Sequence, residues 1–259
     1  MPEVRACVFC EGTPLTREHV YPQWLAASLP DQLPYRGQRT SVVYLPEDSD
    51  FIMPNVFREV GQEFTQTVVK RTCESCNSGW MNDLERQVRK ALTMMIQGHA
   101  FVATMEDSES LATWVAKTCL MAQFTHPESL AMPQAYIDWI YSTRSPPPNM
   151  HIWAIPTRTE DWGVRMEHRG YLFNSDAKVD SSDPCNTHCT VIGLGYVAFW
   201  ILGSTRSSLF PSELINYSPP TAVRLWPQGS SFKWKPQPCL GDMELRFLVD
   251  FLNEEKPAD

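Results

Sequence analysis

The sequence lacks any apolar run long enough to cross a membrane. Its longest apolar stretch, residues 191–203 (VIGLGYVAFWILG), has 13 residues and is interrupted by two glycines, whereas a membrane-spanning helix needs about 20. The opening residues, MPEVR, are not followed by the apolar segment of a secretory signal. We therefore expect a soluble, cytoplasmic protein with no membrane partner, in which cysteines stay reduced.

The chain also has fewer positively charged than negatively charged residues. The chain has 22 lysines and arginines against 30 aspartates and glutamates, which gives a net charge of −8. This balance argues against tight, non-specific binding to nucleic acid. Apolar residues make up 43% and charged residues 20% of the 259 positions, so the composition is that of a folded protein with one or two domains.

Hydrophobic periodicity divides the chain into residues 1–99 and residues 100–259, without an internal repeat. In the first part we predict strands at 41–45 and 66–72, the former inside an inserted loop region (30–66), and a helix from 81 to about 98. We predict one helix at 108–125, with a capping box near its start, and another at 133–142. These two helices would connect the first part of the chain to the C-terminal sheet. Strands near 151–156, 164–173, 187–202 and 222–226, then a helix at 241–253, would complete an α+β fold whose C-terminal mixed sheet carries the final helix.

Two Cys-x-x-Cys pairs lie far apart in the first part of the chain. They consist of Cys7 and Cys10, and of Cys73 and Cys76. Four thiolates with this spacing suit a closed tetrahedral site for structural Zn²⁺. A zinc ribbon that only stabilises the fold would carry the same four residues.

A carboxylate, an imidazole and a carboxamide accompany these cysteines. Glu18 and His19 lie between the two pairs, and Asn77 directly follows the second. Together they form the minimum set for metal-dependent hydrolysis of a phosphodiester bond. The sequence therefore indicates a nuclease.

The stretches EHVYP (residues 18–22) and CESCNSG (residues 73–79) resemble the HNH endonuclease superfamily, the ββα-metal or His-Me finger nucleases. Many members of that family carry two such cysteine pairs. The resemblance covers about residues 5–86 and implies that they form a zinc-stapled ββα-metal module. It also implies an endonuclease that acts on DNA, with RNA as the alternative substrate, and by analogy alone a role in bacterial defence or a mobile element.

The resemblance also assigns roles to individual residues. His19 matches the general base that takes a proton from water. Glu18 and Asn77 match the ligands of a catalytic Mg²⁺ or Mn²⁺, which prefers oxygen atoms. Contacts to the nucleic-acid backbone are expected from five basic residues near the second cysteine pair, although a solvated surface would explain them equally well: Lys70, Arg71, Arg86, Arg89 and Lys90.

Simpler explanations exist for the same residues. Glu18 could form a surface salt bridge, His19 could be a buried hydrogen-bonded histidine, and Asn77 could cap a helix. Val68 occupies the place of the family's central asparagine. With the acidic balance, this substitution favours the alternative of a non-catalytic, zinc-stabilised module that binds nucleic acid or protein. In either case we expect residues 100–259 to serve recognition, regulation or dimerisation, through a homodimer or a partner protein.

A second group of potential metal ligands is shorter. Cys185, His188 and Cys189 lie within five residues, but no matching pair occurs elsewhere in the chain. We therefore predict buried thiols on a strand at this position and no metal site.

Overall fold

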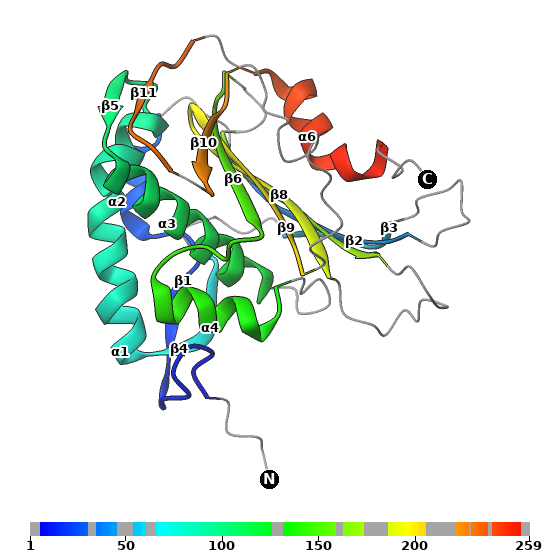
Figure 1. The fold of residues 1–259 in the computed structure, drawn as a ribbon. Coiled ribbons are helices and arrows are strands. Elements are labelled where there is room, and N and C mark those ends of the chain that lie inside the picture. Colours follow the sequence, from blue (N-terminus) through cyan, green and yellow to red (C-terminus); the bar gives the residue numbers. More distant parts are fainter. Residues whose placement is uncertain are drawn as a thin grey trace.

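The computed structural model describes residues 6–30, 35–45, 54–60, 66–125, 132–158, 163–173, 186–205, 221–227, 229–237 and 240–254. Within them, a seven-stranded sheet forms the centre of the molecule (Figure 1). Its strands follow the order β10-β6-β9-β8-β7-β2-β3. The pairing of β2 with β7 is parallel and every other pairing in this sheet is antiparallel, so the sheet is mixed. The strand bounds are β2 Tyr35–Leu45, β3 Pro54–Val60, β6 Met150–Pro156, β7 Val164–Phe173, β8 Thr187–Leu194, β9 Val197–Ser204 and β10 Val223–Trp226.

Helices cover both faces of this sheet (Figure 1). On one side lies α3 (Met105–Gln123), which is buried at nearly every position and is joined by α2 (Asn82–Ile96) and α4 (Gln134–Thr143). On the other side lies α6 (Asp242–Glu254), whose Leu245 and Leu248 pack in a separate apolar cluster. Strands β6, β8 and β9 are buried at every position because both of their faces are covered.

A smaller two-stranded pair lies at the N-terminal end of the chain. Strand β1 (Leu15–His19) pairs antiparallel with β4 (Val68–Cys73). Directly after β4 come the short helix α1 (Glu74–Cys76), a wide helical turn η3 (Asn77–Met81) and α2. The backbone breaks at Gly79, with φ −90° and ψ −116°, so α1 and α2 have different directions. The remaining short elements are the 3-10 helix η1 (Gln23–Ser28) and the pair β5 (Phe101–Ala103) and β11 (Phe232–Trp234).

Several expected elements need correction. The segment 30–66 holds two strands, β2 and β3, and these complete the large sheet instead of forming an inserted loop with one strand. Helix α3 begins at Met105 because its capping box uses Thr104 and Asp107: the backbone N–H of Asp107 donates to the hydroxyl of Thr104, and the Asp107 carboxylate accepts from the N–H of Thr104. The expected strand at 187–202 is the hairpin β8–β9, which turns at Gly195 with φ +59°.

One apolar core joins the two parts of the chain that the sequence separates at residue 99. It includes Phe9 and Leu25 from the first part, and Trp114 and Phe199 from the second. The β1–β4 pair and α2 therefore pack against the same elements that support the large sheet. In the part of the chain that the structure describes, no helix is long and apolar enough to cross a membrane.

Candidate functional site

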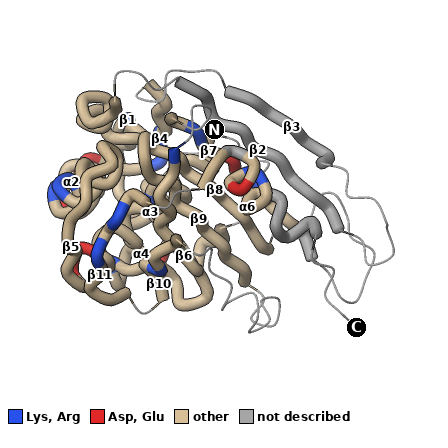
Figure 2. The backbone as a smooth tube through the Cα atoms, turned by 90° about the horizontal axis from the view of Figure 1, so that it is seen from above, with Lys and Arg blue, Asp and Glu red and all other residues tan. Residues whose placement is uncertain are grey.

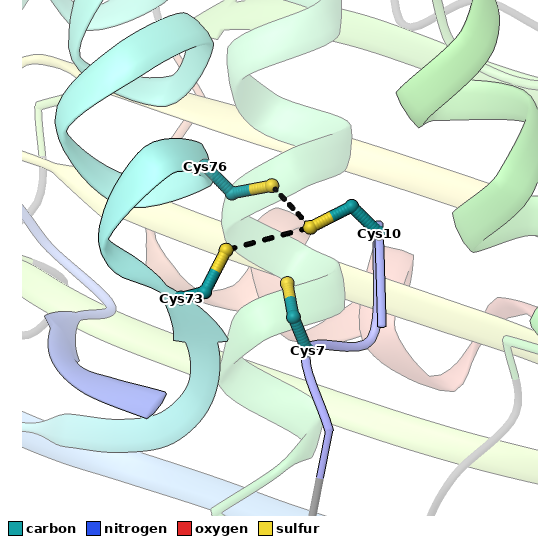
Figure 3. Close-up of side chains that lie close together, drawn as sticks. All are labelled: Cys7, Cys10, Cys73 and Cys76. Carbon is teal, nitrogen blue, oxygen red and sulfur yellow. Dashed lines mark hydrogen bonds between the residues drawn. The ribbon is translucent and has the colours of Figure 1, made fainter. Parts of the chain in front are cut away.

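The four cysteines of the two pairs lie together although 62 residues separate Cys10 from Cys73 (Figure 3). All four sulfur atoms lie within 4.8 Å of one another, and none is in a disulfide. The Sγ atom of Cys10 is 3.4 Å from that of Cys73 and 3.5 Å from that of Cys76. Sulfur atoms around a tetrahedral zinc ion, each about 2.3 Å from the metal, lie roughly 3.8 Å apart. The cluster could therefore hold a metal such as zinc.

Two neighbours shape this cluster. A Cβ atom on Gly12 would lie 3.2 Å from the sulfur atoms of both Cys10 and Cys73, so a side chain at that position would crowd the thiols. The hydroxyl of Ser75 lies 3.1 Å from the sulfur of Cys73 and lowers the pKa of that thiol to about 6. Burial raises the pKa of Cys76, so the thiols of the cluster differ, and a metal ion would bind them as thiolates.

Strand β1 carries Glu18 and His19 at the end that pairs with Val69 and Val68 of β4, away from Cys73. Between Thr16 and Glu18 the pairing with β4 shifts register, which is the signature of a β-bulge. Asn77 fixes this bulge from the helical side, since its amide nitrogen donates to the hydroxyl of Thr16 (3.2 Å) and to the carbonyl of Arg17 (3.3 Å). Asn77 is also the C-cap residue of α1, where its backbone N–H donates to the carbonyl of Glu74. The two side-chain bonds use its amide nitrogen, so its Oδ1 atom is the potential metal ligand.

Glu18 is buried, with 5% of its surface exposed, and faces a buried lysine. The Nζ atom of Lys117, on α3, lies 3.4 Å from a carboxylate oxygen of Glu18 and 3.1 Å from one of Glu85, on α2. Burial raises the pKa of Glu18, the charge of Lys117 opposes this, and the charge of Glu85 adds to it. Two ionised carboxylates and one lysine leave a charge of −2 + 1 = −1, which would favour the binding of a further cation.

These residues surround a cleft of about 380 Å³. Glu18, His19 and Asn77 all line it, together with Glu85 and Arg17. The Nε2 atom of His19 lies 3.3 Å from the amide nitrogen of Gln23, a contact that orients the ring. The carboxylate and carboxamide oxygen atoms in the cleft are the donors that Mg²⁺ and Mn²⁺ prefer.

The five basic residues lie around this region with different neighbours. The guanidinium of Arg89 lies 5.3 Å from the ring centre of Trp24, a residue that lines the cleft. Arg71 lies over Phe124, and Arg86 forms an ion pair with Asp83. Lys70 and Lys90 are exposed. Acidic and basic positions occur side by side on α2 (Figure 2), so this helix does not present a purely basic surface.

Glu85 and Lys117 were not predicted as site residues from the sequence. Glu85 lies two helical turns after Asn77, but it looked like one of several charges on a solvated helix face. Lys117 carried a clearer signal, because it is the one charged residue in the apolar run LATWVAKTCLMAQ (residues 111–123). A lysine there must be buried and paired if the helix is buried. Its two partners depend on how α3 packs against β1 and α2.

Comparisons of the chain with protein-family models, curated proteins and solved structures gave no match.

Proposed function

We propose that this protein is a metal-dependent endonuclease of the HNH type that hydrolyses phosphodiester bonds in DNA. One observation carries the proposal: Glu18, His19 and Asn77 line a single cleft where β1, β4 and the following helix meet. These three positions are the ones that resemble the family's active site. The four clustered cysteines lie at the other end of the same β1–β4 pair, since Leu15 is paired with Cys73.

In this proposal the cysteines hold a structural zinc ion that ties the N-terminal loop to α1 and so keeps Asn77 against β1. Glu18, Asn77 and Glu85 provide oxygen atoms for Mg²⁺ or Mn²⁺, which would stabilise negative charge on the phosphate and on the leaving oxygen. His19 takes the proton from the attacking water molecule. Arg17, which also lines the cleft, supplies a positive charge toward a phosphate oxygen.

One such site cuts one strand in each encounter. A double-strand break therefore requires a homodimer or two successive nicks. We assign target recognition, dimerisation or contact with a partner protein to the part of the chain after residue 99.

Nicking of supercoiled plasmid tests the proposal. Wild-type protein should nick in Mg²⁺ or Mn²⁺, and His19→Ala should not, while its zinc content and melting temperature stay unchanged. His99→Ala is a matched control, because His99 is an exposed histidine that does not line the cleft, and this variant should nick like wild type. If wild-type protein cuts neither plasmid, single-stranded DNA nor RNA, the nuclease proposal is wrong.

The ion pair between Glu18 and Lys117 favours a second candidate function. A carboxylate already neutralised by a buried lysine could be purely structural, and the protein would then be a zinc-stabilised module that binds nucleic acid or protein without cleavage. Zinc content of one or more ions per chain together with the absence of cleavage on all three substrates would support this candidate.

A further inference from the structure

A second cluster of potential metal ligands lies on the opposite side of α3 from Lys117. It contains Cys119 from α3, His168 from β7 and His188 from β8, all with 1% or less of their surface exposed. His168 is paired with Thr190 across the β7–β8 ladder, and His188 lies two residues before Thr190. Because side chains alternate along a strand, His188 and Thr190 point to the same face of the sheet as Cys119.

The donor atoms of these side chains converge. One atom each from Cys119, His168 and His188 lies within 4.8 Å of the other two. The hydroxyl of Thr190 is close to all three, at 2.7 Å from Nδ1 of His168 and 3.4 Å from both Nδ1 of His188 and Sγ of Cys119. Ligands of a tetrahedral zinc ion, with Zn–N of about 2.0 Å and Zn–S of about 2.3 Å, lie roughly 3.3–3.8 Å apart. Changes of roughly 1–1.5 Å in these separations would bring the three donors to such distances and leave the fourth position of a tetrahedral ion open.

The position of His188 is hard to explain as ordinary core packing. A Cβ atom on Gly203 would lie 2.3 Å from Nε2 of His188, so the glycine makes room for the ring and keeps its Nδ1 atom toward the cluster. Within the described residues, Nε2 of His188 has no hydrogen-bond partner. Because Nε2 is directed at Gly203, Nδ1 is the ring nitrogen on the side of Thr190, and it is the atom that a metal ion in the cluster would bind.

The adjacent cysteine gives a useful contrast. Cys189 lies on β8 between His188 and Thr190, and its side chain therefore points to the other face, where its thiol donates to the carbonyl of Leu248 (3.1 Å). As expected from the sequence, Cys189 is a buried thiol on a strand. His188 belongs to a different group, whose other members come from distant parts of the chain, and Cys185 lies outside the described residues.

We propose that Cys119, His168 and His188 form a second metal site, buried between α3 and the sheet, that holds a zinc ion. Two neutral imidazoles and one thiolate are a donor set that zinc accepts readily and that hard cations such as Mg²⁺ do not. Binding transfers the thiol proton of Cys119 to solvent and changes no oxidation state.

The site would act on the fold and does not depend on the proposed nuclease activity. It would tie α3 to β7 and β8, since one ligand comes from each element. Lys117 lies two residues before Cys119 on the same helix. Anchoring Cys119 therefore also sets the position of α3 from which Lys117 reaches Glu18.

Elemental analysis of full-length protein purified without chelators, from cells grown with added zinc, tests the proposal. We expect two zinc ions per chain, and one in Cys119→Ala. Cys189→Ala is the matched control, because it removes a buried thiol of the same core without touching the cluster; it should keep both ions. Equal zinc loss in the two variants would assign the loss to general unfolding and overturn the proposal.

A measurement on wild-type protein avoids the question of whether a variant folds. Zinc-edge X-ray absorption reports the average ligands of all bound zinc. Four sulfur atoms in one site and one in the other give a mean of about 2.5 sulfur atoms per zinc, with a clear imidazole contribution. One zinc per chain with only sulfur ligands would show that the cluster is a hydrogen-bonded network around Thr190, and the proposal would fail.

Discussion

The ammonium group of Lys117 lies 3.4 Å from the carboxylate of Glu18, and both side chains are buried. The two residues are 99 positions apart in the sequence, and the same ammonium group is 3.1 Å from the carboxylate of Glu85. Through this contact α3, which also packs against the large sheet, holds the carboxylate of Glu18 in position in the cleft.

Replacing Lys117 by methionine should destabilise the protein by about 3–5 kcal/mol, because the buried carboxylate of Glu18 and the half-buried carboxylate of Glu85 would lose their positive partner. Urea denaturation measures the change. The double variant Lys117→Met with Glu18→Gln should recover part of the lost stability, since Glu18→Gln removes one of the two negative charges left without a partner. Added Mn²⁺ should also stabilise Lys117→Met more than wild type if the carboxylates bind a cation. If the change in the free energy of unfolding of the double variant equals the sum of the changes in the two single variants, the interaction between Lys117 and Glu18 is not important for stability.

Cys73→Ser should release the metal from the four-cysteine cluster and unfold the β1–β4 region, because a structural zinc ion contributes folding free energy directly. Metal content and thermal melting measure both effects. A variant with full zinc content that melts like wild type would rule out a ligand role for Cys73. Ser75→Ala should keep zinc at neutral pH but release it at a higher pH than wild type does on acidification, because Ser75 lowers the pKa of Cys73.

In the proposed nuclease, Asn77→Ala should keep the fold but reduce metal-dependent nicking by at least about 100-fold, because it would remove a proposed oxygen ligand and the two hydrogen bonds that hold the bulge of β1. Initial rates of plasmid nicking measure this loss. Ser78→Ala is the control, since Ser78 also lines the cleft but bonds to Glu74. An unchanged rate in Asn77→Ala would remove Asn77 from the site.

Arg89→Ala should weaken binding to DNA and reduce the slope of log affinity against log salt by about one, if Arg89 contacts a phosphate beside the cleft. Fluorescence anisotropy at several salt concentrations gives the slope, with Ca²⁺ in place of the catalytic metal to prevent cleavage. Lys233→Ala on β11, at the other end of α2 from α1 (Figure 1), should leave the slope unchanged. Equal slopes for Arg89→Ala and wild type would place Arg89 outside the interface.

His151 should make the protein less stable in mild acid. Burial, assisted by the charge of Arg224, lowers the pKa of His151 to about 4 in the folded state, below its ordinary value of 6.5. The folded state therefore binds fewer protons, and the stability that this residue contributes above pH 6.5 is lost as the pH falls through the range from 6.5 to about 4.

Urea denaturation at pH 7.5 and at pH 5, in the presence of zinc, measures this effect. His151→Asn should lose less stability between the two pH values than wild type, by a difference on the order of 1–2 kcal/mol. The exposed His99 provides the control substitution His99→Asn. If both variants follow the wild-type pH dependence, His151 is not the group that titrates.

Local patterns in the sequence determined most of the secondary structure. The strand Val164–Phe173 has the predicted bounds, and β6, β10 and the final helix α6 lie within one residue of their predicted positions. The hairpin β8–β9 was predicted as one strand, and β11 was not predicted. This success has a physical reason, since period-two and helical hydrophobic patterns depend only on neighbouring residues. The two cysteine pairs likewise predicted the shared cluster, because the Cys-x-x-Cys spacing is typical of metal ligands.

Tertiary structure alone decided which distant residues meet. Strands β2 and β3 joined the large sheet through parallel pairing with β7, a contact across more than 100 residues that no local pattern encodes. Lys117 and Cys119 are two residues apart on α3, yet one reaches Glu18 in the cleft and the other reaches the two histidines on the sheet. The contacts of these two residues depend on the packing of α3 between β1 and the sheet, because opposite sides of one buried helix contact different parts of the chain.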